Sequence, residues 1–333
     1  MRYLTIVEYG TFLGINSNCL VIRHEGVIVK EISLSHLRTI AILKNGITLS
    51  SDLVQACAIR NIKIFFLDWR MQIYSAVIAQ NQHATVALRK AQFKAIEDQE
   101  KSCFISKEIT YTKVKNQRSV LLYFGKYIAQ SDNGRYEIIH KSTDKLNEIC
   151  QNIRTLTSTN NDWKFILLGY EGEAAKLYWK TLSNVRLLPD DFIAREGRNA
   201  NSITNKALNY GYAILLSQIW SALDNAGLEV FGGFYHEDRS GKPSLVLDVM
   251  EEYRAWVVDR IVIKLREKLS KSNDFDTKIK KQISDNIRET LQKQHFYNNK
   301  NIKLENIIQR QVYRLSGYIS CSKDKYKGYK FKW

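Results

Sequence analysis

The sequence predicts an α+β protein in which a small, mostly β domain at the N-terminus is followed by a larger all-α C-terminal domain. Two observations carry this prediction. β-Branched and aromatic residues occur in short runs over residues 1–80, and apolar residues then recur at helical spacing over residues 89–333. Residues 81–88 are predicted as a linker, because the polar run that begins at Gln80 ends the first pattern.

The N-terminal domain is predicted as short strands separated by Gly, Asn and charged turns. Ser50 to Asp52 then caps a helix that continues to Arg60. The predicted strands are residues 3–7, 11–15, 19–23, 27–32, 39–42, 63–67 and 73–79.

The rest of the chain is predicted to be helical. Its two prolines, Pro189 and Pro243, both fall in loops that precede helices. The tail, residues 320–333, alternates Lys with aromatic residues and is predicted to be loosely ordered. The predicted helices are residues 85–105, 113–128, 145–156, 171–182, 206–226, 244–271 and 277–295.

The charge balance favours an anionic partner. Fifty Lys and Arg against 34 Asp and Glu give a formal net charge of +16, and residues 261–333 alone hold 18 basic and 7 acidic residues. Such an excess attracts polyanions and releases their counterions. The alternative is a merely soluble basic protein, but the 18 Tyr and 6 Trp interleaved with the basic residues favour nucleic acid.

The cysteines and the hydropathy point to a cytoplasmic protein. Five widely spaced Cys without a CxxC pair indicate neither a zinc site nor a disulfide framework, so reduced thiols are expected. The first residues lack a secretory pattern, and no run of about 20 apolar residues is present. A membrane partner is therefore not expected.

A metal site is predicted on the segment from Gly227 to Asp259. It places His236 on a Gly-flanked loop and then opens a helix with Asp248 and Glu251 three residues apart. Residues at that spacing share a helix face, so an imidazole and two carboxylates can converge. Mixed nitrogen and oxygen ligands suit a divalent metal that acts on phosphate. Each residue also has a plainer interpretation: a satisfied loop histidine, or acids that are solvated or paired with Arg254.

A fourth ligand is available at Glu171. This residue follows a small turn at Gly169 and is expected to begin a helix whose Ala174 and Ala175 let a neighbouring helix approach closely. The alternative is a first-turn acid that the helix dipole favours.

The whole chain resembles the CRISPR-associated protein one family, the integrase and endonuclease of CRISPR adaptation. Three motifs carry the resemblance: GYEGEAAKLYW at 169–179, NANSITNKALNYGYAIL at 199–215 and GLEVFGGFYHEDRSGKPSLVLDVMEEYR at 227–254. Their order and separation agree with the family. Glu229-Val230 stands where Asp-Pro is frequent, and Ser35-His36 where a proline-led turn is common; neither departure touches a ligand.

The resemblance implies the site and its chemistry. The family's metal ligands fall on Glu171, His236 and Glu251, and Asp248 matches a further ligand or a close neighbour of the ligands. The implied cofactor is Mg²⁺ or Mn²⁺. The implied reaction is strand transfer, in which the 3′ hydroxyl of a short captured duplex (a prespacer) attacks a phosphodiester at the edge of a CRISPR repeat; DNA cleavage is the related hydrolytic activity.

The implied partners are double-stranded DNA, a second copy of the chain through the β domain, and CRISPR-associated protein two, which bridges two dimers. Arg254 is an expected phosphate contact, with an ion pair to Asp248 or Glu251 as the alternative. The other candidate DNA contacts are Arg195, Arg198, Lys176, Lys242 and Tyr170. Two further functions stay open: a metal-dependent endonuclease or transposon-type integrase without CRISPR partners, and a non-catalytic nucleic-acid scaffold.

Overall fold

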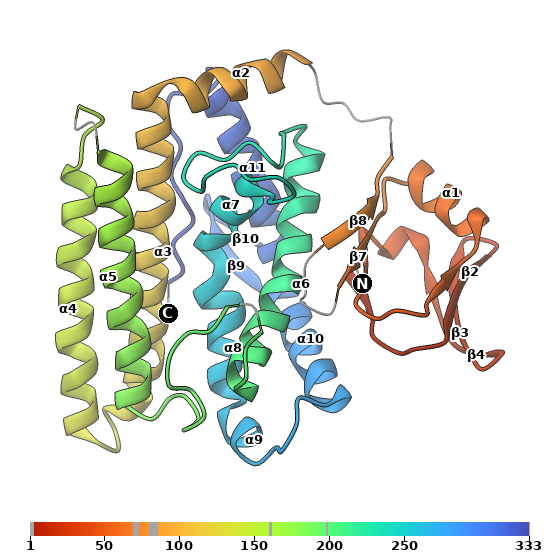
Figure 1. Ribbon diagram of the computed structural model, residues 1–333, viewed down its shortest axis with the longest axis horizontal. Coiled ribbons are helices and arrows are strands. Elements are labelled where there is room, and N and C mark those ends of the chain that lie inside the picture. The colour runs from red at the N-terminus through yellow and green to blue at the C-terminus, as the bar shows by residue number, and fades with distance from the viewer. Residues whose placement is uncertain (1–2, 69–72, 80–85, 160–161, 198, 333) are drawn as a thin grey trace. The chain divides into compact units, whose positions relative to one another are not determined.

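The chain divides into two compact units, residues 1–83 and 84–333. The computed structural model describes residues 3–68, 73–79, 86–159, 162–197 and 199–332 (Figure 1). The predicted succession of a β-rich part and a helical part is confirmed. No helix within these ranges is long and apolar enough to cross a bilayer.

The N-terminal unit contains two four-stranded sheets and one helix. In the sheet ordered β1-β5-β7-β8, the β1–β5 and β5–β7 pairs are parallel and β8 is antiparallel to β7. In the sheet ordered β4-β3-β2-β6, β2, β3 and β4 form antiparallel hairpins. The bounds are β1 Tyr3–Ile6, β2 Thr11–Asn16, β3 Cys19–His24, β4 Val27–Ser33, β5 Thr39–Ile42, β6 Thr48–Leu49, α1 Ser51–Ile59, β7 Lys63–Leu67 and β8 Ile73–Val77.

Alternating apolar residues build the core of this unit. Leu13, Leu20, Ile40 and Ile64 are completely buried in one cluster between strands. The Ser50 side chain accepts a hydrogen bond from the Leu53 N–H at 3.2 Å and caps α1, as the sequence predicts.

The second unit is built from helices and one hairpin. The bounds are α2 Val86–Glu97, α3 Gln99–Ile128, α4 Asn133–Thr155, α5 Trp163–Asn184, α6 Ile203–Asn225, α7 Ser244–Arg254, a π-helical turn Ala255–Asp259, α8 Arg260–Lys264, α9 Arg266–Ser270, α10 Thr277–Gln292, β9 Gln294–Tyr297, β10 Lys300–Lys303 and α11 Leu304–Ile319.

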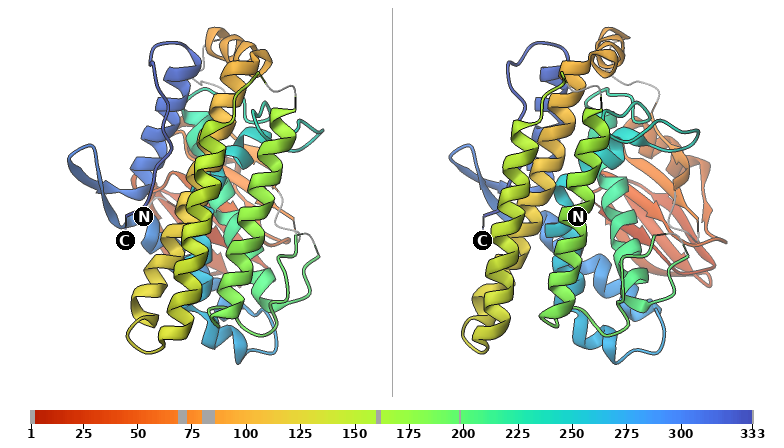
Figure 2. Two further views of the ribbon diagram at one scale, coloured as in Figure 1. Left: turned by 90° about the vertical axis from the view of Figure 1, so that its left-hand side faces the viewer. Right: turned by 60° about the vertical axis from the view of Figure 1, so that its left-hand side comes forward.

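Helix α3 is the centre of this unit. It packs against α4 and α5 on one side, with which it forms a layer of long helices (Figure 2), and against α7 on the other. Asp98 starts α3 by accepting hydrogen bonds from the N–H groups of Glu100 and Lys101, both at 3.0 Å. Side chains from α5 and α7 therefore meet beside α3, and this is where the predicted ligands lie.

Helix α7 runs directly into the π-helical turn Ala255–Asp259. A π turn inserts one extra residue, and such insertions are frequent beside functional sites. The sequence predicts one continuous helix over 244–271, so this interruption and the break at Leu265 are differences from the prediction.

Two further differences concern helix starts. Helix α5 begins at Trp163, eight residues before Glu171, because the buried Trp163 and Leu167 anchor an additional two turns. Gly169 is therefore inside a helix, and the predicted turn there is wrong. Residues 86–88, predicted as the end of a linker, are the first turn of α2, while residues 81–85 of that linker lie outside the described residues.

The tail is packed against the helices from Tyr326 to Phe331. Tyr326 and Phe331 are almost fully buried, and the Asn116 side chain of α3 donates a hydrogen bond to the Tyr329 carbonyl (2.9 Å) and accepts one from the Phe331 N–H (3.0 Å). The Phe331 ring stacks on Trp256, with centroids 4.9 Å apart. The expectation of a loosely ordered tail is wrong for residues 326–331, because their aromatic side chains pack beside α3 and the turn that follows α7.

Candidate active site

The loop between α6 and α7 is fastened to α7 by one carboxylate. Asp248 is completely buried, and its oxygens accept hydrogen bonds from the consecutive N–H groups of Phe234 (2.7 Å), Tyr235 (3.0 Å) and His236 (2.9 Å). Gly233 permits this approach, since a Cβ there would lie 3.0 Å from Asp248 Oδ2 and 2.6 Å from Ser244 Cβ. The helix therefore determines where the loop, and with it His236, is held.

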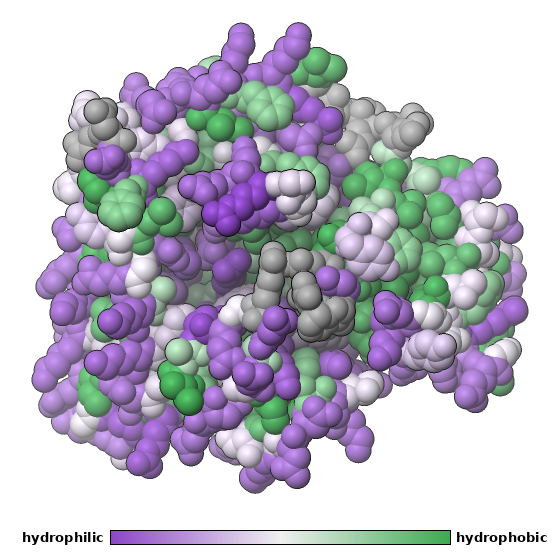
Figure 3. Space-filling view, in the orientation of Figure 1, coloured by the Kyte–Doolittle hydropathy of each residue, from purple (hydrophilic) through white to green (hydrophobic). Residues whose placement is uncertain are grey.

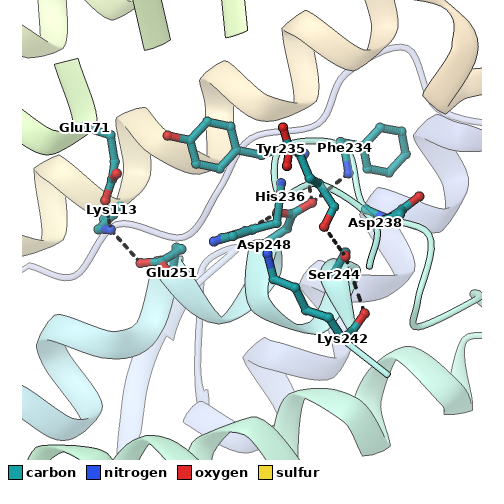
Figure 4. A network of polar contacts seen from close by, with 12 residues as sticks. Lys113, Glu171, Phe234, Tyr235, His236, Asp238, Lys242, Ser244, Asp248 and Glu251 are labelled. Carbon is teal, nitrogen blue, oxygen red and sulfur yellow. Dashed lines mark hydrogen bonds and ion pairs between the residues drawn. The ribbon is translucent and has the colours of Figure 1, made fainter. Parts of the chain in front are cut away.

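The same carboxylate orients the imidazole. Nδ1 of His236 lies 2.6 Å from Oδ1 of Asp248 (Figure 4). A carboxylate acceptor makes Nδ1 the protonated nitrogen of the neutral ring and leaves the lone pair on Nε2. This carboxylate–imidazole arrangement is typical of histidines that ligate metals through the other nitrogen.

Two other predicted ligands meet at a lysine. Lys113 of α3 forms ion pairs with Glu171 of α5 and with Oε2 of Glu251 of α7, the latter at 2.8 Å. Figure 4 shows the ammonium between the two carboxylates. The exposed fractions of the three side chains are 13% for Lys113, 22% for Glu171 and 4% for Glu251, so the three charges are largely shielded from water.

Lys113 and Glu251 each stabilise the charged form of the other. Burial lowers the pKa of Lys113, but the Glu251 and Glu171 carboxylates outweigh it, and the net shift is upward. Burial raises the pKa of Glu251, but the Arg254 guanidinium and the Lys113 ammonium outweigh it and bring it to about 2. His236 adds a smaller lowering effect on the pKa of Glu251.

A tyrosine between two guanidinium groups forms the adjoining wall. Arg195 and Arg254 lie 5.1 and 5.0 Å from the ring centre of Tyr212, a geometry of cation–π attraction. The Tyr212 hydroxyl donates to Asp259, which also accepts a hydrogen bond from Tyr178 at 3.2 Å. Burial raises the pKa of Asp259 to about 6, against the lowering effects of both hydroxyls and both arginines.

These groups open into a cavity of about 550 Å³. Glu171, Lys113 and Glu251 lie on its wall together with Arg254, Tyr212 and Asp259. The remaining lining residues are Gln117, Ala175, Lys176, Trp179, Lys180, Ser183, Phe192, Ile193, Ala194, Arg195 and Ala255. Three carboxyl groups and five basic side chains therefore share one hollow.

The predicted ligands separate into two pairs. The sequence places Asp248 and Glu251 on one helix face, yet Asp248 faces the loop and Glu251 faces α3. Both Asp248 oxygens are occupied by the loop N–H groups, so the structure favours a supporting role over direct ligation. Glu171 lies in the middle of α5, which excludes the interpretation of a first-turn acid.

The predicted DNA contacts are partly assembled. Arg195, Arg254 and Lys176 line the cavity. Arg254 also makes the alternative contact considered for it, an ion pair with Glu251 Oε1 at 2.9 Å. Lys242 and Tyr170 are half-buried and are not part of the described cavity wall, and Arg198 lies outside the described residues.

Lys113 and Asp259 are site residues that sequence reasoning missed. Lys113 lies 58 residues before Glu171 and is one of many basic residues on α3. Asp259 ends the π-helical turn that follows α7, and because that turn is not apparent from the sequence, spacing alone does not place Asp259 beside Glu251.

The donor set fits a hard divalent cation, with one obstacle. Two carboxylates and an imidazole Nε2 are ligands that Mg²⁺ and Mn²⁺ accept. Within the described ranges, however, no three His, Cys, Asp or Glu side chains are gathered closely enough to hold a metal, and the Lys113 ammonium stands between the glutamates. The donor types suit the ion, and the position between the two glutamates is taken by Lys113.

Comparison with known proteins identifies the family of the chain. Residues 4–296 match the family model described as CRISPR associated protein Cas1. A CRISPR-associated endonuclease Cas1 from Francisella tularensis subsp. novicida is 44% identical over 339 residues, covering 100% of both chains. Among solved structures, a casposase bound to integration product has a TM-score of 0.80 at 24% identity, covering 98% of this chain and 93% of that one.

A second solved structure is a Cas6-RT-Cas1–Cas2 complex, with a TM-score of 0.78 at 18% identity, covering 99% of this chain and 36% of the matched chain. The two structural matches support the fold, and the family model and the full-length relative identify the family. By sequence and by fold, the chain belongs to the CRISPR-associated protein Cas1 family.

Proposed function

We propose that this protein is a metal-dependent DNA integrase and endonuclease of CRISPR adaptation. It joins the 3′-hydroxyl ends of short captured duplexes to the CRISPR repeat as new spacers, and it also cleaves DNA. One observation carries the proposal: the carboxylates of Glu171 and Glu251, from two helices, converge on the wall of a basic cavity, and Asp248 of the Glu251 helix orients His236. The full-length 44% identity to a curated Cas1 endonuclease supports it.

Glu171, Glu251 and Nε2 of His236 would hold the cation, Mg²⁺ or Mn²⁺. When bound, the ion supplies Lewis acidity to a phosphodiester oxygen and orients the attacking hydroxyl. Asp248 accepts the Nδ1 proton of His236 and holds the loop amides, so that the ligand nitrogen keeps its direction.

The cavity is suited to the DNA backbone. Arg195, Arg254 and Lys176 give it positive charge where a phosphate has to approach two carboxylates. The reaction exchanges one phosphodiester for another: the 3′ oxygen forms a new bond to phosphorus, and the old bond breaks to leave a 3′ hydroxyl. No covalent intermediate with the protein is required.

Double-stranded DNA and Cas2 are the partners that the relatives suggest. The solved structures with this fold include a Cas1–DNA complex and the Cas6-RT-Cas1–Cas2 complex. A homodimer through the N-terminal unit is part of the proposal. Hydrophilic side chains dominate the visible surface of the helical unit (Figure 3), as expected for a surface that contacts DNA.

The test is strand transfer of a labelled short duplex into a plasmid that carries a repeat, with Mn²⁺ or with a chelator. Glu171→Ala, His236→Ala and Glu251→Ala should each reduce joining by at least about 100-fold, because each removes a proposed ligand. Glu173→Ala is the matched control, since Glu173 is exposed on the same helix. Full metal-dependent joining by the ligand variants would refute the site.

A second arm tests the scaffold alternative. DNA affinity should fall steeply as salt increases, because the chain carries a net charge of +16 and binds a polyanion. Salt-dependent DNA binding without joining or cleavage, in the presence of Cas2 and metal, would favour a non-catalytic scaffold. Joining that does not require the repeat would favour an integrase outside CRISPR adaptation.

A further inference from the structure

Lys113 has an unusual position among the basic residues of the cavity. Its ammonium contacts two carboxylates from two different helices, Glu171 on α5 and Glu251 on α7. The lysine itself comes from a third helix, α3. Figure 4 shows that it occupies the space between the two carboxylates, where a shared cation would have to lie.

Charge balance makes this contact informative. Oε1 of Glu251 pairs with Arg254, and Oε2 pairs with Lys113, which also pairs with Glu171. Two carboxylates and two basic groups thus form a neutral cluster that is largely shielded from water. A divalent cation added to that cluster would leave two uncompensated positive charges in a medium of low dielectric constant, which is strongly unfavourable.

We propose that Lys113 is a built-in counter-ion of Glu171 and Glu251 and competes with the metal for these two carboxylates. This inference rests on the metal site proposed above. The ammonium has somewhere to go, because Lys113 also lines the cavity and its four-carbon stem is flexible. Metal binding therefore requires that Lys113 leave the carboxylates.

The same helix offers a matched control. Lys115 is two residues away, and its Nζ donates to the neutral amide oxygen of Asn147 at 2.6 Å. Lys115→Met removes the same charge and leaves the same apolar stem as Lys113→Met, but it frees no carboxylate. Any general effect of a lost charge on α3 appears in both variants.

The experiment is a calorimetric titration of the full-length wild type and both variants with Mn²⁺ at one fixed pH and salt concentration. In the wild type the metal must displace the Lys113 ammonium from both carboxylates, a cost that is absent from Lys113→Met. Lys113→Met should therefore bind Mn²⁺ at least about tenfold more tightly than wild type. Lys115→Met should bind like wild type.

Thermal unfolding provides a second readout. Without metal, Lys113→Met leaves two carboxylates that face each other without their shared ammonium, so its melting temperature should fall. Mn²⁺ should then raise that temperature more than it does for wild type. Lys113→Gln, which keeps hydrogen-bond donors without the charge, replaces the Met variant if that variant does not fold.

The outcomes separate the two proposals. Equal or weaker Mn²⁺ binding by Lys113→Met, with wild type binding normally, overturns the competition and makes Lys113 a residue that only gathers the carboxylates. Absence of Mn²⁺ binding in every variant, together with metal-independent joining, overturns the metal site itself. Mn²⁺ binding by Lys113→Met alone supports both.

Discussion

The carboxylate of Asp248 and the imidazole of His236 act as one structural unit. Their Oδ1 and Nδ1 atoms are 2.6 Å apart, and the same oxygen accepts the His236 backbone N–H at 2.9 Å. One buried side chain thus fixes the position of the residue and the direction of its ring. A loop alone would not hold a ligand nitrogen in one orientation, because loops are the more mobile parts of a fold.

Asp248→Asn should weaken metal binding without removing a ligand. The amide nitrogen would face donor groups of the loop, which leaves at least one buried N–H without an acceptor and costs about 1–3 kcal/mol. Loss of the imidazole's partner should reduce Mn²⁺ affinity by about 10- to 100-fold. Denaturant unfolding and Mn²⁺ titration measure the two effects. Glu237→Gln, exposed on the same loop, is the control, and unchanged Mn²⁺ affinity in Asp248→Asn would contradict the supporting role.

Two glycines inside helices should respond oppositely to alanine. A Cβ on Gly172 of α5 meets nothing within 4 Å, so Gly172→Ala should stabilise the protein by about 0.5–1 kcal/mol. A Cβ on Gly211 of α6 would lie 2.5 Å from Cγ1 of the buried Val258, so Gly211→Ala should destabilise by about 1–3 kcal/mol. Urea midpoints of the two variants test this; a common sign would argue against the α6 packing described here.

The fold class could be predicted because it depends on local patterns, and a local pattern also points to the segment that carries two of the proposed ligands. Strand and helix periodicities identify the two parts of the chain, and His236 and Glu251 lie within one short segment. The start of α5 could not be predicted in this way. Gly169 suggests a turn locally, but the buried Trp163 and Leu167 extend the helix through packing against other elements.

The sequence does not predict which side chains from different helices contact one another. Nothing near Lys113 indicates that it meets Glu171 of α5, because the contact depends on how α3, α5 and α7 pack. The prediction of a loosely ordered tail is wrong for a similar reason. Its alternation of Lys with aromatic residues is typical of loose segments, but the groove formed by Asn116 and Trp256 receives Phe331.

Ionisation of Asp259 should make the free energy of unfolding depend on pH. Its pKa is raised from 3.8 to about 6, so between these values the folded protein binds more protons than the unfolded chain. The contribution of the protonated Asp259 to the free energy of unfolding is fully present below pH 3.8, and it is lost as the pH rises through about 6. Asp259→Asn should remove this decline, which is on the order of 3 kcal/mol. Denaturant unfolding across that pH range measures it, and parallel pH profiles of wild type and variant would exclude the effect.

Tyr326 of the tail should stabilise the helix that carries the proposed ligand Glu251. Its hydroxyl donates to Oε1 of the buried Glu252, and the Tyr329 N–H donates to Oε2 at 3.2 Å. Tyr326→Phe keeps the ring but leaves a buried carboxylate oxygen without its donor, which should cost about 1–3 kcal/mol.

Tyr329→Phe is the matched control for this prediction. Among the described residues, the Tyr329 hydroxyl donates one exposed hydrogen bond of 3.4 Å, to the Phe296 carbonyl, and the substitution leaves the Tyr329 backbone N–H untouched. Its free energy of unfolding should therefore stay within about 0.5 kcal/mol of wild type. Because Glu252 follows Glu251 directly on α7, Tyr326→Phe should also slow strand transfer, whereas Tyr329→Phe should not. Equal free energies of unfolding for the two variants would mean that the hydrogen bond from Tyr326 to Glu252 does not stabilise α7.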